Sequence, residues 1–270
     1  MIPIGSHPAW HPVFETLAYA AGYAVFRHLR TKQGDVVAEP QRWTVLAAAA
    51  VGALVGARLL GLAEQWPTVV QAWHQRQILT LLLSPGGKTI VGGLLGGWLG
   101  VEIVKRLNGI RRRTGDLFAL PLCIGIAIGR IGCLLAGLAD DTYGKPTTLP
   151  WAVDLGDGIG RHPVQLYEIL FLALLGFVLT RIQVEGTVSG HDFSRPENNS
   201  TKSRALAPEG SRFRIFLGGY LAWRFAIDFI KPQPLVYGLN LIQWACLVGL
   251  ALLTLDHALT RKDLHEQIAR

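Results

Sequence analysis

Two arginines lie within stretches that are otherwise apolar, where their chemistry suits the binding of an anion. Arg130 occurs in IGRIG and Arg224 in AWRFAID. A guanidinium keeps its charge at any physiological pH, and its planar fork matches a pair of phosphate oxygens. An ionisable side chain at membrane depth is costly, so it usually faces a partner or a cavity. Five further ionisable residues share this setting: Glu15, Arg58, Glu102, Glu168 and Asp228.

The neighbours of each arginine indicate what it could do. Asp228 follows Arg224 by four positions, which places both on one face of a helix. The pair could be an ion pair that ties two helices together or the wall of a polar pocket. Arg130 is flanked by glycines, which allow another backbone or a ligand to come close. We therefore expect Arg130 to contact a ligand.

The loop that precedes RHPVQLYE is the other segment with polar groups that could act on a substrate. Residues 139–163 are rich in Gly and Pro, which fix turns by their chemistry, and they end at Arg161, His162 and a proline. A solvated linker would not expose apolar side chains such as Trp151. This loop is therefore predicted to fold as a cap.

Composition limits the class of protein that must position these residues. Hydrophobic residues make up 50% of the chain and charged residues 17%, whereas a soluble domain carries about a quarter charged residues. The net charge of +7 fits the cytoplasmic loops of a membrane protein better than a nucleic-acid partner. The three cysteines, without CxxC spacing, suggest neither a disulfide scaffold nor a zinc site.

Seven segments approach the roughly 20 apolar residues that a membrane-spanning helix needs. With the N-terminus outside, the inner segments hold 18 of the 26 Lys and Arg residues and the outer segments 5, as the positive-inside rule requires. The predicted fold is an all-α integral membrane protein with seven transmembrane helices, N-out and C-in. The segments are 11–29, 43–63, 89–107, 116–138, 164–182, 213–231 and 236–257.

These helices are predicted to form a single transmembrane domain over 1–270. Residues 64–88 mix apolar residues with Gln, His and Arg, which is typical of an amphipathic arm lying at the outer interface. Residues 139–163 form the outer cap loop. The polar segment 183–212 is predicted to be a mobile cytoplasmic loop.

Four motifs, in order along the chain, resemble the prolipoprotein diacylglyceryl transferases, a family of bacterial integral membrane enzymes. They are GGKTIVGGLLGG at 86–97, GRIGCLLAG at 129–137 running into TYGKPT, RHPVQLYE at 161–168, and YLAWRFAIDF at 220–229. The resemblance implies transfer of the diacylglyceryl group of phosphatidylglycerol to the lipobox cysteine thiol of a prolipoprotein signal peptide, the first step of lipoprotein maturation. The product is a thioether, glycerol phosphate leaves, and neither metal nor cofactor takes part.

The resemblance also implies a setting and roles for individual residues. The enzyme would cross the bacterial inner membrane several times, with its active site toward the outer leaflet. Arg130 would bind the lipid phosphate, and Arg224 would be a second essential arginine. His162 matches a motif position of the family, and Glu15, Asp228 and His162 are the other positions that we predict to be catalytic. The implied substrate-binding positions, besides Arg130, are Gly92, Gly93, Gly144, Arg161, Tyr19 and Tyr220.

Three positions depart from the family's pattern. Val91 stands where a histidine proposed as the base is usual, Cys133 replaces an asparagine, and Glu15 replaces a tyrosine. The thiol must still lose its proton to become a nucleophile, and the candidate bases are Glu15, Asp228 and His162, in that order. The departures leave open a catalytically altered or inactive lipid-binding membrane protein of the same fold. A small transporter is a third possibility, which the lack of an internal repeat disfavours.

Overall fold

The computed structural model describes residues 1–4, 6–35, 39–83, 87–110, 112–182 and 209–268. In this part of the chain the protein is almost wholly helical. The segment predicted as a mobile cytoplasmic loop, 183–212, lies outside the described residues up to position 208. The elements are β1 (Ile2–Pro3), α1 (Trp10–Gln33), α2 (Glu39–Glu64), α3 (Trp66–His74), α4 (Ile78–Leu83), α5 (Ile90–Leu107), α6 (Asp116–Ala136), the 3₁₀ helix η1 (Gly137–Asp140), β2 (Val153–Asp154), β3 (Gly160–Arg161), α7 (Val164–Arg181), α8 (Ser211–Ile227), the 3₁₀ helix η2 (Asp228–Ile230) and α9 (Leu241–Ile268).

Packing divides the chain into two compact units, and the division falls within α8. The first unit comprises Met1–Val36, Arg112–Tyr220 and Phe229–Pro232. The second comprises Val37–Arg111, Leu221–Asp228 and Gln233–Arg270. Each unit has its own buried side chains and is described here by itself.

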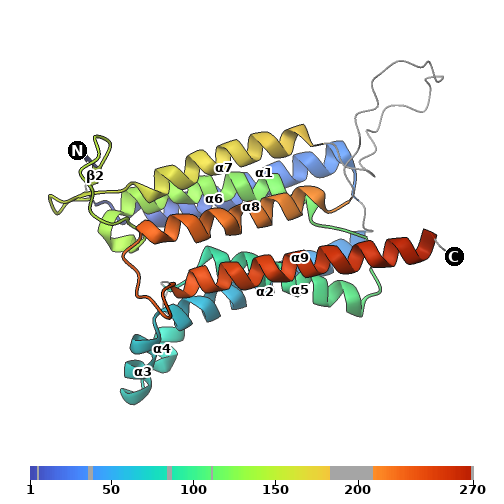
Figure 1. The fold of residues 1–270 in the computed structure, drawn as a ribbon, viewed down its shortest axis with the longest axis horizontal. Helices are drawn as coiled ribbons and strands as arrows, with labels where there is room; N and C mark the ends of the chain where they lie inside the picture. Colours follow the sequence, from blue (N-terminus) through green and yellow to red (C-terminus); the bar gives the residue numbers. More distant parts are fainter. Residues whose placement is uncertain (5, 36–38, 84–86, 111, 183–208, 269–270) are drawn as a thin grey trace. The chain divides into compact units, whose positions relative to one another are not determined.

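The first unit is built around α6, which packs against both α1 and α7 (Figure 1). One close contact between α1 and α6 is at Gly132. A Cβ atom added there would lie 2.7 Å from Cβ of Phe14 and 3.4 Å from the carbonyl oxygen of His11, which is too close for any side chain. This glycine near Arg130 therefore admits the backbone of α1.

The loop before α7 is folded, and the N-terminus adds a strand to it. β2 pairs with β3 in antiparallel fashion and with β1 in parallel. Ala152, Val153 and Leu155 are at most 3% exposed. The indole of Trp151, which is half exposed, donates a 2.7 Å hydrogen bond to the hydroxyl of Tyr167 on α7. These contacts give the loop a small core of its own.

In the second unit, α2 and α5 pack along each other through glycines, and α9 contacts both helices. A Cβ atom added at Gly56 would lie 2.3 Å from the carbonyl oxygen of Gly92, and one added at Gly96 would lie 2.3 Å from that of Gly52. The two backbones therefore touch directly, as small residues allow in membrane helices.

Within the described residues, four helices are long and apolar enough to cross a membrane. These correspond to four of the seven predicted segments: Pro40–Glu64, Asp116–Asp140, Val164–Arg181 and Leu241–Leu259. The other three predicted segments are also helical, as α1, α5 and α8. α8 has only 17 residues, and α5 carries three charged residues toward its end.

The segment between α2 and α5 contains two short helices. α3 has 9 residues and α4 has 6, so neither can cross a bilayer. Several of their large apolar side chains are exposed: Trp66, Val70, Trp73 and Leu79. Such a surface is what the predicted interfacial arm requires.

Candidate functional site

Arg130 lies in the interior of the first unit, accompanied by an acid from another helix. Its side chain, on α6, is 5% exposed, and its Nε lies 2.9 Å from Oε2 of Glu168 on α7. The hydroxyl of Tyr220 donates a 2.6 Å hydrogen bond to Oε1 of the same carboxylate. A buried cation is costly unless it is paired. Glu168 therefore offsets the cost of burying Arg130 and fixes the plane of the guanidinium.

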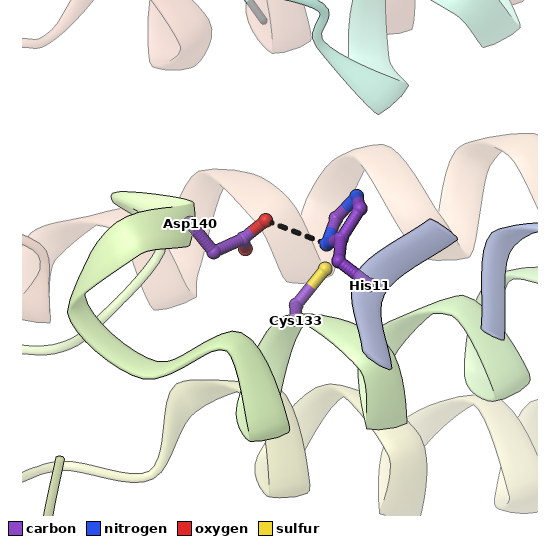
Figure 2. A group of neighbouring side chains, drawn as sticks. All are labelled: His11, Cys133 and Asp140. Carbon is purple, nitrogen blue, oxygen red and sulfur yellow. Dashed lines mark ion pairs between the residues drawn. The ribbon is translucent and has the colours of Figure 1, made fainter. Parts of the chain in front are cut away.

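One turn along α6, a second group of polar side chains adjoins the arginine. Nη1 of Arg130 donates to Sγ of Cys133 at 3.6 Å. His11, from the start of α1, and Asp140, from η1, reach the same place, and Figure 2 shows all three side chains converging. Nδ1 of His11 lies 3.0 Å from Oδ1 of Asp140, whose carboxylate also accepts a hydrogen bond from the hydroxyl of Thr142.

The chain segment before α1 is tied to the end of α6, and this brings His11 to Asp140. The hydroxyl of Ser6 donates to the carbonyl oxygen of Ala136 at 2.8 Å, and the amide of His7 donates to that of Leu135 at 2.7 Å. The close contact at Gly132 then sets the distance between the two helices. Backbone packing, rather than the side chains alone, therefore places this group.

The donor atoms of His11, Cys133 and Asp140 lie within 4.8 Å of one another, so their chemistry and spacing would suit a metal ion. The permanent charge of Arg130, 3.6 Å from the sulfur, opposes a divalent cation at this position. We therefore assign no metal to the group.

Arg224 has its own acid in the second unit. Its Nη2 lies 2.9 Å from Oδ1 of Asp228, and both side chains are at most 7% exposed. The side-chain amide of Asn240 donates to Oδ2 of Asp228 at 3.4 Å. The side-chain amide of Gln243 donates to the carbonyl oxygen of Phe225 at 3.1 Å. Asp228 is thus engaged by an arginine and by a side-chain amide.

Arg161 holds the folded loop together. It donates from Nη1 and Nη2 to the two carboxylate oxygens of Asp157, each at 2.6 Å, and its guanidinium lies 5.2 Å from the centre of the Tyr143 ring. These hydrogen bonds from Arg161 hold the pKa of Asp157 below its ordinary value and raise the pKa of Arg161 itself. In this structure the guanidinium of Arg161, which could bind a substrate, is instead hydrogen-bonded to Asp157.

His162 and Gly144 meet where the loop joins α7. Nδ1 of His162 lies 3.5 Å from the hydroxyl of Tyr167. A Cβ atom added at Gly144 would lie 2.5 Å from the carbonyl oxygen of His162. Only glycine fits there, so packing by itself accounts for this residue.

The remaining predicted site residues lie elsewhere in their units. Tyr19 donates to Glu15 at 3.4 Å, one turn away on α1, and Tyr19 is 72% exposed. Among the described residues, no hydrogen bond or ion pair joins either of them to Arg130. Gly92 lies in the contact between α2 and α5, whereas a Cβ atom at Gly93 would make ordinary contacts at 3.6 Å.

Two features of the first unit were not among the predicted site residues. Glu168 stands in RHPVQLYE and is an acid within an apolar segment, and these signals could have marked it as a partner for Arg130. The pair of His11 and Asp140 leaves no such signal, because 128 residues separate them along the chain.

Comparison with known proteins gives one family. A family model described as prolipoprotein diacylglyceryl transferase matches residues 1–256. A phosphatidylglycerol–prolipoprotein diacylglyceryl transferase of Bordetella parapertussis is 30% identical over 257 residues, which cover 90% of this chain and 86% of the relative. Proteins of the same name from Cupriavidus necator and Geobacter sulfurreducens are 30% and 26% identical, over 86% and 85% of this chain and 84% and 80% of their own length.

Proposed function

Because the chain belongs to the prolipoprotein diacylglyceryl transferase family, we propose that it transfers the diacylglyceryl group of phosphatidylglycerol to the lipobox cysteine of a prolipoprotein. The protein is a mostly helical membrane protein. The apolar segments and the distribution of Lys and Arg support seven spans, N-out and C-in. Membership of the family supports the inner membrane of a bacterium as their location. The substrates would then meet the protein at the outer leaflet.

One observation carries the proposal: a guanidinium is buried among apolar helices and is held in place by an acid from a neighbouring helix. Arg130 is 5% exposed and lies 2.9 Å from Glu168. A cation in a medium of low dielectric constant attracts an anionic headgroup more strongly than it would in water. This supports Arg130 as the residue that binds the lipid phosphate.

The proposed reaction breaks one bond and forms another at the glycerol C3 carbon. The sulfur of the acceptor cysteine attacks this carbon and forms a thioether. The bond from the carbon to the phosphate oxygen breaks, and its electron pair leaves with glycerol phosphate. Negative charge grows on the departing phosphate, so a fixed guanidinium lowers the barrier by stabilising the leaving group.

Arg224 is proposed as the second essential arginine, held in its own unit by Asp228. Tyr220 supports Glu168 through its hydroxyl, which gives it a role in positioning Arg130. Gly144 and Arg161 shape the folded loop. The reaction as written needs neither a metal nor a soluble cofactor.

The experiment is transfer by the purified protein from labelled phosphatidylglycerol to a synthetic lipobox peptide, read as the mass of the thioether product. We expect Arg130→Ala to slow transfer by about 10²–10³-fold, as loss of one donor to a developing anion does elsewhere. Arg181→Ala is the matched control, because Arg181 is an exposed arginine at the end of α7. A wild-type protein that makes no thioether, but still binds phosphatidylglycerol vesicles, would support the lipid-binding alternative.

A further inference from the structure

The proposed transfer requires a proton acceptor, since the thiolate and not the thiol is the nucleophile. This inference rests on the proposed function and deepens it. The contacts in the structure argue against two of the proton acceptors that the sequence suggested, Asp228 and Glu15. Asp228 is engaged by Arg224 and Asn240. Glu15 accepts from Tyr19, on a part of α1 with no hydrogen bond or ion pair to Arg130 among the described residues.

His11 has what these candidates lack. Nδ1 faces a carboxylate, at 3.0 Å from Asp140, which is 10% exposed, whereas the imidazole is 37% exposed. A carboxylate at Nδ1 keeps the proton on that nitrogen and leaves the lone pair on Nε2. The ring is therefore oriented, is accessible, and has one nitrogen that can take a proton.

His11 also lies near the arginine proposed to bind phosphate. A ring nitrogen of His11 is within 4.8 Å of Sγ of Cys133, and Nη1 of Arg130 is 3.6 Å from the same sulfur. Both groups thus border one sulfur atom within one unit. A thiol that approaches a phosphate held by Arg130 would come close to the imidazole.

We propose that His11, oriented by Asp140, takes the proton from the attacking thiol of the prolipoprotein. Nε2 accepts the proton as the sulfur attacks the glycerol carbon, and the electron pair of the breaking bond leaves on the phosphate oxygen. The imidazolium that forms is an ion pair with Asp140, and it then returns the proton to water. Asp140 is a positioning residue, since it acts through His11.

The charges around the imidazole come from three elements. Asp140 faces it from η1, and Cys133 faces it from α6, with Arg130 one turn before the cysteine. On α1 itself, Glu15 follows His11 by one turn. The carboxylate in contact with the ring offsets the positive charge that the ring gains, whereas Arg130 is directed to Glu168 and to the sulfur.

The test compares His11→Gln and Asp140→Asn with the full-length wild type in the transfer assay across a range of pH. A general base contributes about 10²–10⁴-fold, so we expect His11→Gln to be slower by about 10²-fold or more at pH 7. A free thiol ionises near pH 8.5, so we expect this deficit to narrow to within about 10-fold near pH 9. Asp140→Asn should lose less than His11→Gln.

A second measurement separates proton transfer from a structural role. Imidazole added to His11→Ala should restore part of the rate, because it supplies the missing base; a variant damaged only in packing would not respond. His28→Gln is the matched control, since His28 is an exposed histidine on the same helix. If wild type is active while His11→Gln keeps its rate within about 3-fold, or stays equally slow at every pH without rescue, the role of His11 is refuted. An inactive wild type would instead refute the proposed function.

Discussion

The ion pair between Arg130 and Glu168 is expected to be needed for stability as well as for orienting the guanidinium, and Glu168→Gln tests this. The substitution keeps the size of the side chain and an oxygen that can accept from Tyr220, but it removes the countercharge of Arg130. Both side chains of the pair are at most 6% exposed. Removing one partner of a buried ion pair leaves an uncompensated charge, which costs about 3–5 kcal/mol.

A smaller change provides the comparison. Tyr220→Phe removes only the hydroxyl that donates to Glu168 at 2.6 Å, from a residue that is 0% exposed. Loss of a hydrogen bond to a charged group costs about 1.5–3 kcal/mol. We therefore expect the free energy of unfolding to fall further in Glu168→Gln than in Tyr220→Phe. The assay is unfolding of the protein in mixed micelles by increasing fractions of sodium dodecyl sulfate.

The double variant Arg130→Gln/Glu168→Gln decides whether the ion pair is the cause. Removal of both charges leaves neither of them unpaired, so the double variant should be destabilised by less than the sum of the two single changes. Contacting residues show interaction energies of about 0.5–3 kcal/mol in such cycles. Costs that add to within about 0.5 kcal/mol would show that the two side chains stabilise the protein independently and would refute the reasoning.

Three further predictions concern packing and the folded loop. Gly56→Val should destabilise the second unit by about 1–3 kcal/mol, because the side chain would meet the carbonyl oxygen of Gly92 on α5, whereas Gly93→Ala, with contacts at 3.6 Å, should be tolerated in a thermal melt. Gly144→Ala should loosen the loop from α7, since the added Cβ would lie 2.5 Å from a carbonyl oxygen, and faster proteolysis within 139–163 would show this. The pKa of Asp157 is lowered by its hydrogen bonds from Arg161. The stabilisation of the folded loop by this pair is therefore full above the ordinary pKa of an unfolded aspartate and is lost as the pH falls through the lowered pKa. Hydrogen exchange of the amides of 153–161 should rise over that pH range in wild type and stay flat in Asp157→Asn.

Much of the architecture follows from local patterns in the sequence. Runs of apolar residues predicted the positions of the helices, because a membrane helix satisfies its own backbone groups and needs little else to be specified. Because Asp228 follows Arg224 by four positions, the sequence predicted that the two side chains share one face of a helix. In the structure they form an ion pair. The apolar residues in 139–163 predicted a folded loop, and its core contains Val153 and Leu155.

The partners of the polar groups could not be predicted in the same way. The pairing of Arg130 with Glu168, and of His11 with Asp140, depends on which helices are neighbours and at what rotation. No periodicity in one segment encodes a contact with another. The pairing of β1 with β2 is a further example, because two residues of the N-terminus carry no strand pattern.

Hydrogen bonds of the segment before α1 position that helix for the proposed site. Ile2 and Ile4 donate to the backbone of the folded loop, and Ser6 and His7 donate to the end of α6, so four hydrogen bonds hold the residues that precede α1. A helix held only by its apolar face could slide or rotate by a residue at little cost, whereas one such shift would carry the imidazole of His11 away from Asp140. The ties fix the register of α1 against α6 at the position where the pair can form. The segment before the first helix is thus part of the proposed site, since it determines where the proton acceptor lies relative to Arg130 within the first unit.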